Sequence, residues 1–373
     1  MTDECDKKIR YAYYKNKIHK YLNGETDISS LNEALISAAD GEYPRIVKLL
    51  LKHGADVFYR TTDANGDSQN AVETAFLNEH RNNVEILNTV LKHAPLSKQL
   101  QIRYMVCTAK KPLPPGLIPR PKSSFACFDG STLLMDAVRF NRPLPVIRQL
   151  IEAGYDVNTA GKYGKTALFF TSRPKMIRFL IDNGADITVK DDNDFLFCSG
   201  LPWFDKMLPV LKIVLKRNPP KEMLHDIWMD LTASVIVLEE PYRFRTPREL
   251  IKAFHLLLSA GVDVNCNENP SAQKPCRTLM LNEVVKFGSL SMVKYLLKHG
   301  ADPNLVDGMG STALAGCAYE HAGVKVAKAL IKAGADPYWK PAGGYSFMDM
   351  IKNQYYDELA AWLKKHKKHI TDR

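Results

Sequence analysis

Apolar residues recur at fixed distances ahead of a glycine along most of the chain. In VKYLLKHGADPN (293–304), Val293 and Leu296 stand seven and four residues before Gly300. The stretch VKLLLKHGADV (47–57) has the same arrangement much earlier in the chain. Apolar residues at these offsets lie on one face of a helix of about three turns. Glycine can end such a helix because it adopts the left-handed conformation without a side-chain penalty. The pattern therefore predicts an amphipathic helix before each glycine.

Nine segments fit this pattern when each is aligned on the end of its helix. The aligned ends are Gly54, Ala94, Gly154, Gly184, Asn218, Gly261, Gly300, Gly334 and Lys367. Successive ends are 30 to 60 residues apart, and all but one of these intervals are between 30 and 43 residues. The units that end at Ala94 and Asn218 are degenerate. A period of this size predicts a repeat protein in which each copy buries its apolar face against its neighbours.

A second, shorter helix is predicted ahead of several of these helices. The segments GSTLLMDAV (130–138), GKTALFF (164–170) and GSTALAGCA (310–318) each place a threonine two residues after a glycine and before an apolar run. A threonine there can accept a hydrogen bond from the free amides of the first helical turn, which marks a helix start. The predicted unit is thus a turn, a short helix, a loop and a longer helix.

These segments resemble the ankyrin repeat. The strongest matches are LLLKHGADV, LIEAGYDVN, LIDNGADIT, LLSAGVDVN, LLKHGADPN and LIKAGADPY. The resemblance implies an all-α fold, an ankyrin-repeat solenoid of about nine helical-hairpin repeats, several of them degenerate or with insertions. We predict an N-terminal helical cap over residues 1–30 and an ankyrin-repeat domain over residues 31–373.

The chain departs from the family pattern at the start of the short helices. The usual Thr-Pro-Leu-His tetrapeptide is nowhere intact. Threonine is kept at Thr132, Thr166 and Thr312, and leucine follows two residues later. The histidine position holds Met135, Phe169 and Ala315.

The largest interruption of the pattern is an insertion at about 95–128. Its basic residues are Lys98, Arg103, Lys110, Lys111, Arg120 and Lys122, and it contains no acidic residue. It also contains six prolines, so we expect residues 112–121 to be extended and partly polyproline-like. It can serve as a docking segment for an acidic or aromatic-grooved partner, or as a basic crossover packed along the solenoid. Longer loops are predicted at about 239–248 and 265–278.

Composition and charge narrow the class of protein. The chain has 373 residues, of which 45% are apolar and 25% charged, and a formal net charge of +10. This charge suits an acidic partner or nucleic acid, but a solvated basic surface is the simpler explanation. No apolar run approaches the roughly 18 residues of a membrane span. The charged N-terminus and seven scattered cysteines lead us to expect a cytoplasmic protein with no membrane association.

No motif in the sequence indicates an enzyme. It has no glycine-rich phosphate loop, no HExxH, no GxSxG and no CxxC pair, and Cys266 and Cys276 make a poor zinc site. We therefore expect no catalytic residues, no cofactor and no metal. Two alternatives stay open. One is a cryptic Cys/His enzyme, whose residues would meet only in the fold. The other is nucleic-acid association through the insertion, the N-terminal lysines and KKHKKH (364–369), which we do not favour.

The resemblance implies that loop tips and the neighbouring first helices bind another protein. By that analogy we expect partner contacts at Phe128, Arg139, Phe140, Tyr163, Phe170, Asp192, Arg243, Phe244, Tyr319 and Trp339. The expected function is a non-catalytic protein–protein interaction module or scaffold that works as a monomer. Irregular repeats with insertions would also suit a host-directed effector, active in the host cytosol or nucleus.

The resemblance further implies a modification. Ankyrin repeats can be hydroxylated on the asparagine of an Asp-x-Asn motif with leucine eight residues earlier. The positions that match are Asn158, Asn265 and Asn304.

Overall fold

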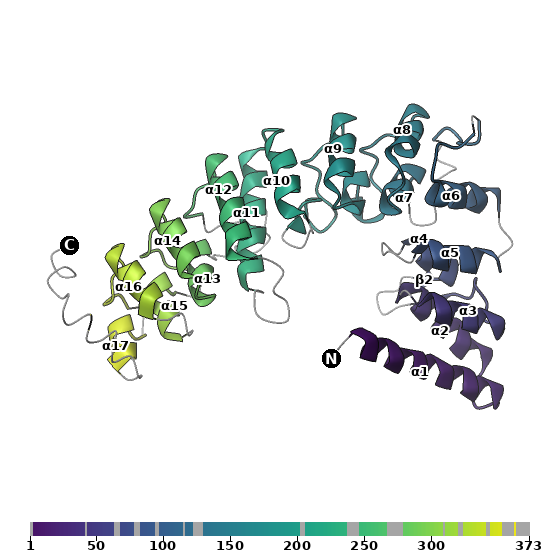
Figure 1. Ribbon diagram of the computed structural model, residues 1–373, viewed down its shortest axis with the longest axis horizontal. Helices are drawn as coiled ribbons and strands as arrows, with labels where there is room; N and C mark the ends of the chain where they lie inside the picture. Colours follow the sequence, from purple (N-terminus) through teal and green to yellow (C-terminus); the bar gives the residue numbers. More distant parts are fainter. Residues whose placement is uncertain are drawn as a thin grey trace. The chain divides into compact units, whose positions relative to one another are not determined.

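The protein divides into two compact helical units. The computed structural model describes residues 3–41, 43–62, 68–77, 83–93, 97–114, 116–121, 130–201, 206–236, 246–266, 279–308, 310–319, 324–340, 344–352 and 362. The first unit comprises Met1–Thr171 and Asp182–Ala185, and the second comprises Ser172–Ile181 and Asp186–Arg373. Each unit is described by itself below (Figure 1).

The first unit is built from helix pairs that stack on one another. Its helices are α1 (Asp3–Leu22), α2 (Ile28–Asp40), α3 (Pro44–Lys52), α4 (Ala71–Leu77), α5 (Asn83–Leu91), α6 (Lys98–Thr108), α7 (Leu133–Arg139) and α8 (Leu144–Glu152), with 3₁₀ turns η2 (Lys162–Gly164) and η3 (Ala167–Phe170). Strands β1 (Thr61–Thr62) and β2 (Ser68–Gln69) form a short antiparallel hairpin. Helix α2 packs on α3 and α4, and α5 packs on α3 and α4.

The second unit shows the repeat most clearly. Its helices are α9 (Pro174–Asp182), α10 (Met207–Leu215), α11 (Lys221–Ile236), α12 (Pro247–Ser259), α13 (Met280–Lys286), α14 (Leu290–Lys298), α15 (Ala313–Tyr319), α16 (Val324–Lys332) and α17 (Phe347–Lys352). Helices α11, α13, α15 and α17 form one row, and α10, α12, α14 and α16 form a second (Figure 1). The predicted all-α solenoid of helical hairpins is confirmed. The second helix predicted for the last repeat lies outside the described residues.

The core consists of the apolar positions that the sequence pattern singled out. The residues four before each aligned end are fully buried at Leu50, Val90, Leu150, Leu180, Val214, Leu257, Leu296 and Leu330. The degenerate units obey the pattern as well, since Val90 and Val214 belong to them. Burial of one such leucine contributes about 1.5–3 kcal/mol relative to exposure. This continuous apolar stripe therefore holds neighbouring repeats together.

The helix ends have the expected left-handed geometry. Gly300 has φ 90°, and the Ala301 amide donates to the carbonyl oxygen of Leu296 at 3.1 Å. In the degenerate unit Asn218 takes φ 49° in place of glycine. Asparagine tolerates this conformation better than other non-glycine residues, which is why that repeat keeps its shape without the glycine.

The threonines start two of the three predicted short helices. Thr132 Oγ1 accepts from the Met135 amide at 3.2 Å, and Thr312 Oγ1 accepts from the Ala315 amide at 3.4 Å. After Thr166 the chain instead forms the 3₁₀ turn η3. Pro174 follows closely and begins α9, and a residue that precedes proline is disfavoured in the α conformation. The segment is therefore too short for a regular helix.

Aspartate and asparagine side chains shape the turns between repeats. In each GAD-type turn the aspartate Oδ1 accepts from the amide two residues later, which fixes the turn; the aspartates are Asp56, Asp156, Asp186, Asp263, Asp302 and Asp336. Asn265 Nδ2 then donates to the Gly300 carbonyl at 3.0 Å, and its Oδ1 accepts from the Asp302 amide at 2.8 Å. Asn304 makes the equivalent two bonds one repeat later.

The described part of the insertion packs against the repeats. Helix α6 lies inside it, and the Gln149 side chain exchanges two hydrogen bonds with the backbone of Leu113, at 2.7 and 2.8 Å. The Tyr155 hydroxyl donates to the Pro119 carbonyl at 3.1 Å. These contacts favour the crossover over the docking segment for residues 97–114 and 116–121.

Candidate interaction surface

Exposed apolar side chains concentrate on the turns between repeats. Among the described residues the exposed large apolar side chains on these turns are Phe58, Tyr163, Phe195, Val306, Tyr338 and Tyr345, with exposed fractions from 37% to 68%. We call these six residues the turn tips. Turns are ordinarily polar, and exposed aromatic groups on rigid turns indicate a binding surface. The turn tips are therefore the first candidate for a functional site.

The turn at 190–196 is held by several hydrogen bonds between its own residues. Asp191 is buried, and its Oδ1 accepts from the amides of Asn193 and Phe195, both at 3.0 Å. The Asp191 amide donates to the Phe195 carbonyl at 2.8 Å, and Asp194 takes a left-handed φ of 67°. These bonds hold Phe195 outward, where it is 56% exposed. Asp192 is exposed beside it, as predicted for a loop tip.

Phe195 was not among the contacts predicted from the sequence. It directly follows the polar run KDDND (190–194) and begins the apolar run FLFC (195–198). A residue at the start of an apolar run is as compatible with packing inward as with exposure, so the pattern alone could not assign it.

Two buried carboxylates lie under this turn. Lys190 Nζ contacts Asp226 Oδ2 at 2.9 Å, and Asp230 is one turn further along α11. Among the described residues neither Asp226 Oδ1 nor Asp230 Oδ2 has a hydrogen-bond partner. Burial raises the pKa of Asp230 to about 7, and the Asp226 charge adds to the increase, while Ser199 and Lys190 lower it. The Asp230 carboxyl is therefore partly protonated at neutral pH.

The Asp230→Asn substitution is expected to change the pH dependence of stability. The folded state keeps a proton on Asp230 that the unfolded chain releases near pH 3.8, so this stabilising contribution is full below that pH and is lost as pH rises through about 7. At pH 8 the variant should be more stable by about 2 kcal/mol, after allowance for partial exposure of the carboxyl. Urea unfolding at pH 5 and pH 8 measures the difference.

The matched control is Glu222→Gln, an exposed residue on the same helix. It should leave the difference between the two pH values unchanged. Equal stability of Asp230→Asn and the parent at both pH values would contradict the raised pKa.

The turn before α17 combines aromatic and charged groups. The Tyr338 amide donates to Asp336 Oδ1 at 2.8 Å, and the Tyr338 side chain is exposed. Trp339, a predicted contact, is half-buried. Lys340 Nζ contacts Asp349 Oδ2 at 2.7 Å. This contact, together with hydrogen bonds from Ser346, lowers the pKa of Asp349 to about 2.

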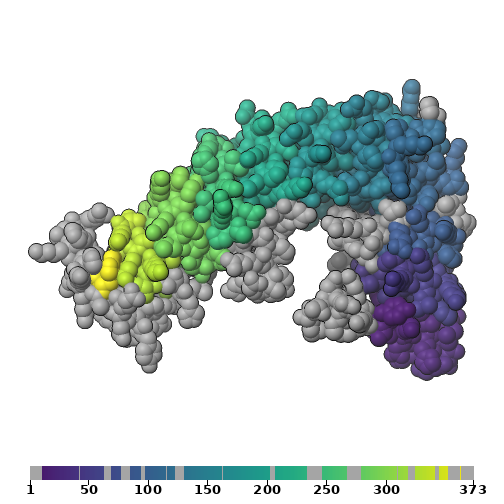
Figure 2. Space-filling model, viewed as in Figure 1, coloured from purple at the N-terminus to yellow at the C-terminus, as the bar shows by residue number. Residues whose placement is uncertain are grey.

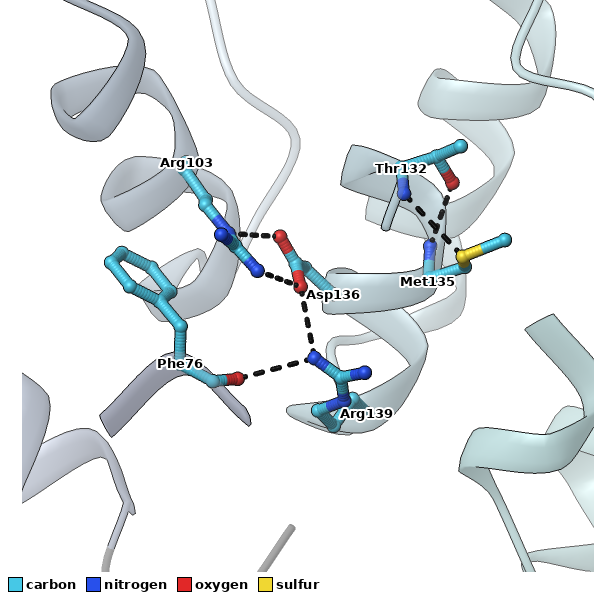
Figure 3. A network of polar contacts seen from close by, with 6 residues as sticks. All are labelled: Phe76, Arg103, Thr132, Met135, Asp136 and Arg139. Atoms are coloured by element: carbon cyan, nitrogen blue, oxygen red, sulfur yellow. Dashed lines mark hydrogen bonds and ion pairs between the residues drawn. The ribbon is translucent and has the colours of Figure 1, made fainter. Parts of the chain in front are cut away.

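Four other side chains form a buried polar network between α4, α6 and α7 (Figure 3). Arg103 Nε and Nη2 donate to the two Asp136 carboxylate oxygens at 2.5 and 2.9 Å. Arg139 Nη1 contacts Asp136 Oδ1 at 3.4 Å and donates to the Phe76 carbonyl at 3.3 Å. The Arg103 guanidinium lies 4.3 Å from the Phe76 ring centre, and that of Arg139 lies 4.2 Å from the Phe170 ring centre. Two arginines thus share one fully buried carboxylate.

This network changes the role of several residues selected from the sequence. Arg103 is only 2% exposed, so it does not contribute to a basic surface of the insertion. Arg139 and Phe140 are buried, and Phe170 is half-buried beneath Arg139. Their side chains hold repeats together, and we leave them out of the proposed contact surface.

Comparison with known families identifies the repeat. Residues 248–340 match the model described as "Ankyrin repeats (3 copies)", and residues 32–62 match the model "Ankyrin repeat". These two parts of the chain are ankyrin repeats. Ankyrin repeats are generally protein–protein interaction modules, so the exposed turn tips lie on a scaffold suited to binding.

Individual proteins resemble parts of this chain at low sequence identity. The "Putative ankyrin repeat protein YahD" of Escherichia coli (strain K12) is 28% identical over 195 residues, which are 51% of this chain and 90% of that protein. The "E3 ubiquitin-protein ligase Ufd4" of Drosophila melanogaster is 34% identical over 109 residues, 28% of this chain and only 4% of that protein. The crystal structure of the human ASB11 ankyrin repeat domain covers 59% of this chain and 91% of its own, with 18% identity and a TM-score of 0.46.

The remaining predicted contacts are of two kinds: one is exposed on a turn, and the others lie outside the described residues. Tyr163 is exposed at the tip of η2, with φ 64°. Phe128, Arg243 and Phe244 lie outside the described residues, as does the Tyr319 side chain. Tyr163, Asp192 and Trp339 are therefore the predicted contacts that the structure places on turns.

The asparagines predicted to be hydroxylated lie in the turns of the repeats. Asn158 Nδ2 donates to the Gly184 carbonyl at 2.9 Å, and Asn265 and Asn304 bond to the next turn through both side-chain atoms. Their hydroxylation stays a prediction.

The structure brings one cysteine and one histidine together. Cys266 Sγ lies 3.5 Å from His225 Nδ1. Burial raises the pKa of the Cys317 thiol to about 12 and also raises the pKa of the Cys198 thiol. Both cysteines are therefore disfavoured as thiolates. Within the described ranges no group of three or more histidine, cysteine or acidic side chains could hold a metal, and no helix could cross a membrane.

Proposed function

We propose that this ankyrin-repeat protein is a non-catalytic binding module that recognises another protein through its turn tips. The observation that carries the proposal is the exposure of Phe195, Tyr338 and Tyr345 on turns held by hydrogen bonds. Aromatic side chains supply much of the binding energy at protein interfaces, and a rigid turn loses little entropy when it binds.

The side chains around Phe195 indicate what kind of partner surface this turn would fit. Phe195 projects beside the exposed carboxylates of Asp192 and Asp194. Such a group fits an apolar pocket with neutral or basic residues at its rim. An acidic partner, which the net charge of the chain favours, would have to bind elsewhere than at this turn.

The test uses a partner identified by affinity purification and then purified. Phe195→Ala and Tyr338→Ala are each expected to weaken its binding by about tenfold or more, because an exposed aromatic anchor contributes roughly 2 kcal/mol. Isothermal titration calorimetry measures the affinity, and a thermal unfolding curve checks that each variant is folded.

Lys216→Ala is the control, because Lys216 is exposed at the end of α10 and away from the turn tips in sequence. It should bind as the parent does. Unchanged affinity in both aromatic variants would refute the turn-tip proposal, even if the partner itself is genuine. The narrower roles of scaffold and host-directed effector stay predictions.

A further inference from the structure

Helix α1 shows aromatic groups to the solvent although its inner face is well packed. Tyr14 and Ile18 are buried in the core of the first unit, and the Tyr14 ring lies 6.2 Å from that of Tyr43. On the outside, Tyr11 is 39% and Tyr13 is 55% exposed. The end of a solenoid must face water and is ordinarily polar. Two exposed rings on a firmly anchored helix therefore call for an explanation.

The charged side chains in the part of the same helix from residue 11 onward are all basic. Residues 11–22 contain Lys15, Lys17 and Lys20 together with His19, and no acidic residue. The three lysines are exposed or half-buried, and Figure 2 shows this part of the chain, in purple, at the surface of the first unit. This charge is complementary to a polyanion.

Each exposed ring is paired with a lysine one helical turn away. Lys15 Nζ lies 5.2 Å from the centre of the Tyr11 ring, and Lys17 Nζ lies 5.4 Å from that of Tyr13. The helix thus offers two sites, each with a flat ring and an ammonium group. Because residues two apart differ by about 200° around a helix, the two sites lie on opposite flanks of its exposed face. A single-stranded nucleic acid offers the matching pair in every nucleotide, a flat base and a phosphate.

We propose that single-stranded nucleic acid crosses the exposed face of α1, with Tyr11 on one flank and Tyr13 on the other stacking on bases, and Lys15, Lys17 and Lys20 contacting phosphates. This site is separate from the turn tips in sequence and in chemistry. Stacking on tyrosine tolerates any base, so the binding has little sequence preference. Double-stranded nucleic acid binds more weakly because its bases are already stacked.

Two other polyanions fit the surface less well. A membrane-binding helix inserts its apolar face into lipid, but the apolar side of α1, with Tyr14 and Ile18, is covered by the protein. An acidic peptide would use the lysines and leave the two rings without a flat partner. The test distinguishes these outcomes.

The experiment measures fluorescence anisotropy of a labelled 20-nucleotide oligouridylate with the full chain at several salt concentrations. Tyr11→Ala combined with Tyr13→Ala should weaken binding by tenfold or more and leave the salt dependence unchanged. Tyr11→Phe with Tyr13→Phe should bind as the parent does, because the rings remain. Lys15→Ala with Lys17→Ala should lower the slope of log affinity against log salt by about 1.4, since each lost phosphate contact on a single strand accounts for about 0.7.

The control is Lys212→Ala with Lys216→Ala, which removes two exposed lysines from α10 in the second unit. It should retain affinity. The proposal fails if the paired tyrosine-to-alanine variant binds normally, or if both lysine pairs weaken binding equally, because the chain then binds through its charge alone. It also fails if polyglutamate or phosphatidylserine vesicles bind as tightly with the same dependence on the two tyrosines.

Discussion

Asp136→Asn should destabilise the first unit by about 3–5 kcal/mol, the range for loss of one partner from a buried ion pair. Asp136 is fully buried and is the carboxylate shared by Arg103 and Arg139. Asparagine has nearly the same volume as aspartate, so the substitution changes packing little. The substitution removes the negative charge that both buried guanidinium groups contact, and this electrostatic loss accounts for the effect. Urea unfolding followed by circular dichroism measures it.

A surface ion pair of the same unit provides the comparison. Lys48 Nζ and Glu85 Oε1 are 2.7 Å apart, but both side chains are about half exposed. Glu85→Gln should therefore cost less than about 1 kcal/mol. If Asp136→Asn costs no more than this control, the network is not an important source of stability.

Trp228→Ala should lower the free energy of unfolding of the second unit by a similar amount. Trp228 is fully buried on α11, with its ring centre 5.5 Å from that of Phe254 on α12. Removing the indole leaves a large cavity, and such substitutions cost about 3–5 kcal/mol. Among the described residues Trp228 Nε1 has no hydrogen-bond partner, so the loss comes from packing alone. The free energy of unfolding again gives the value.

Two further variants provide comparisons for this packing loss. Trp228→Phe keeps part of the ring volume and should cost clearly less than alanine. Phe195→Ala, at an exposed position, should change stability by less than about 0.5 kcal/mol, which also supports its use in the binding test. A loss under 1 kcal/mol for Trp228→Ala would contradict the packing argument.

The regular part of the fold could be predicted from the sequence because it depends on local spacing. An apolar residue four and seven places before a helix end must lie on one face, and Leu296 and Val293 are accordingly buried. The left-handed Asn218 follows from the same alignment. These features need only the order of residues within one repeat.

The buried network could not be predicted in the same way. Arg103 lies in the insertion and pairs with Asp136 in the next repeat, 33 residues later. No local pattern distinguishes such an arginine from a solvated one, and Arg139 was therefore selected as a contact. Phe195 presents a different case, because its exposure depends on the hydrogen bonds of Asp191 within the same turn. Pairings between repeats and the hydrogen bonds of an irregular turn were thus the parts that required coordinates.

The asparagine bonds between turns have a consequence for how the second unit opens. Asn265 ties its own turn to the one at Gly300, and Asn304 ties the next turn to the one at Gly334. Among the described residues these bonds couple a repeat to its immediate neighbour, as in a one-dimensional chain of linked elements. The repeat of α14 has such a coupling on both sides and must break both to unfold alone, whereas the repeats of α12 and α16 each break one. Opening from either side is therefore favoured over opening in the middle of these three repeats, and among them hydrogen exchange should be slowest for the amides of α14.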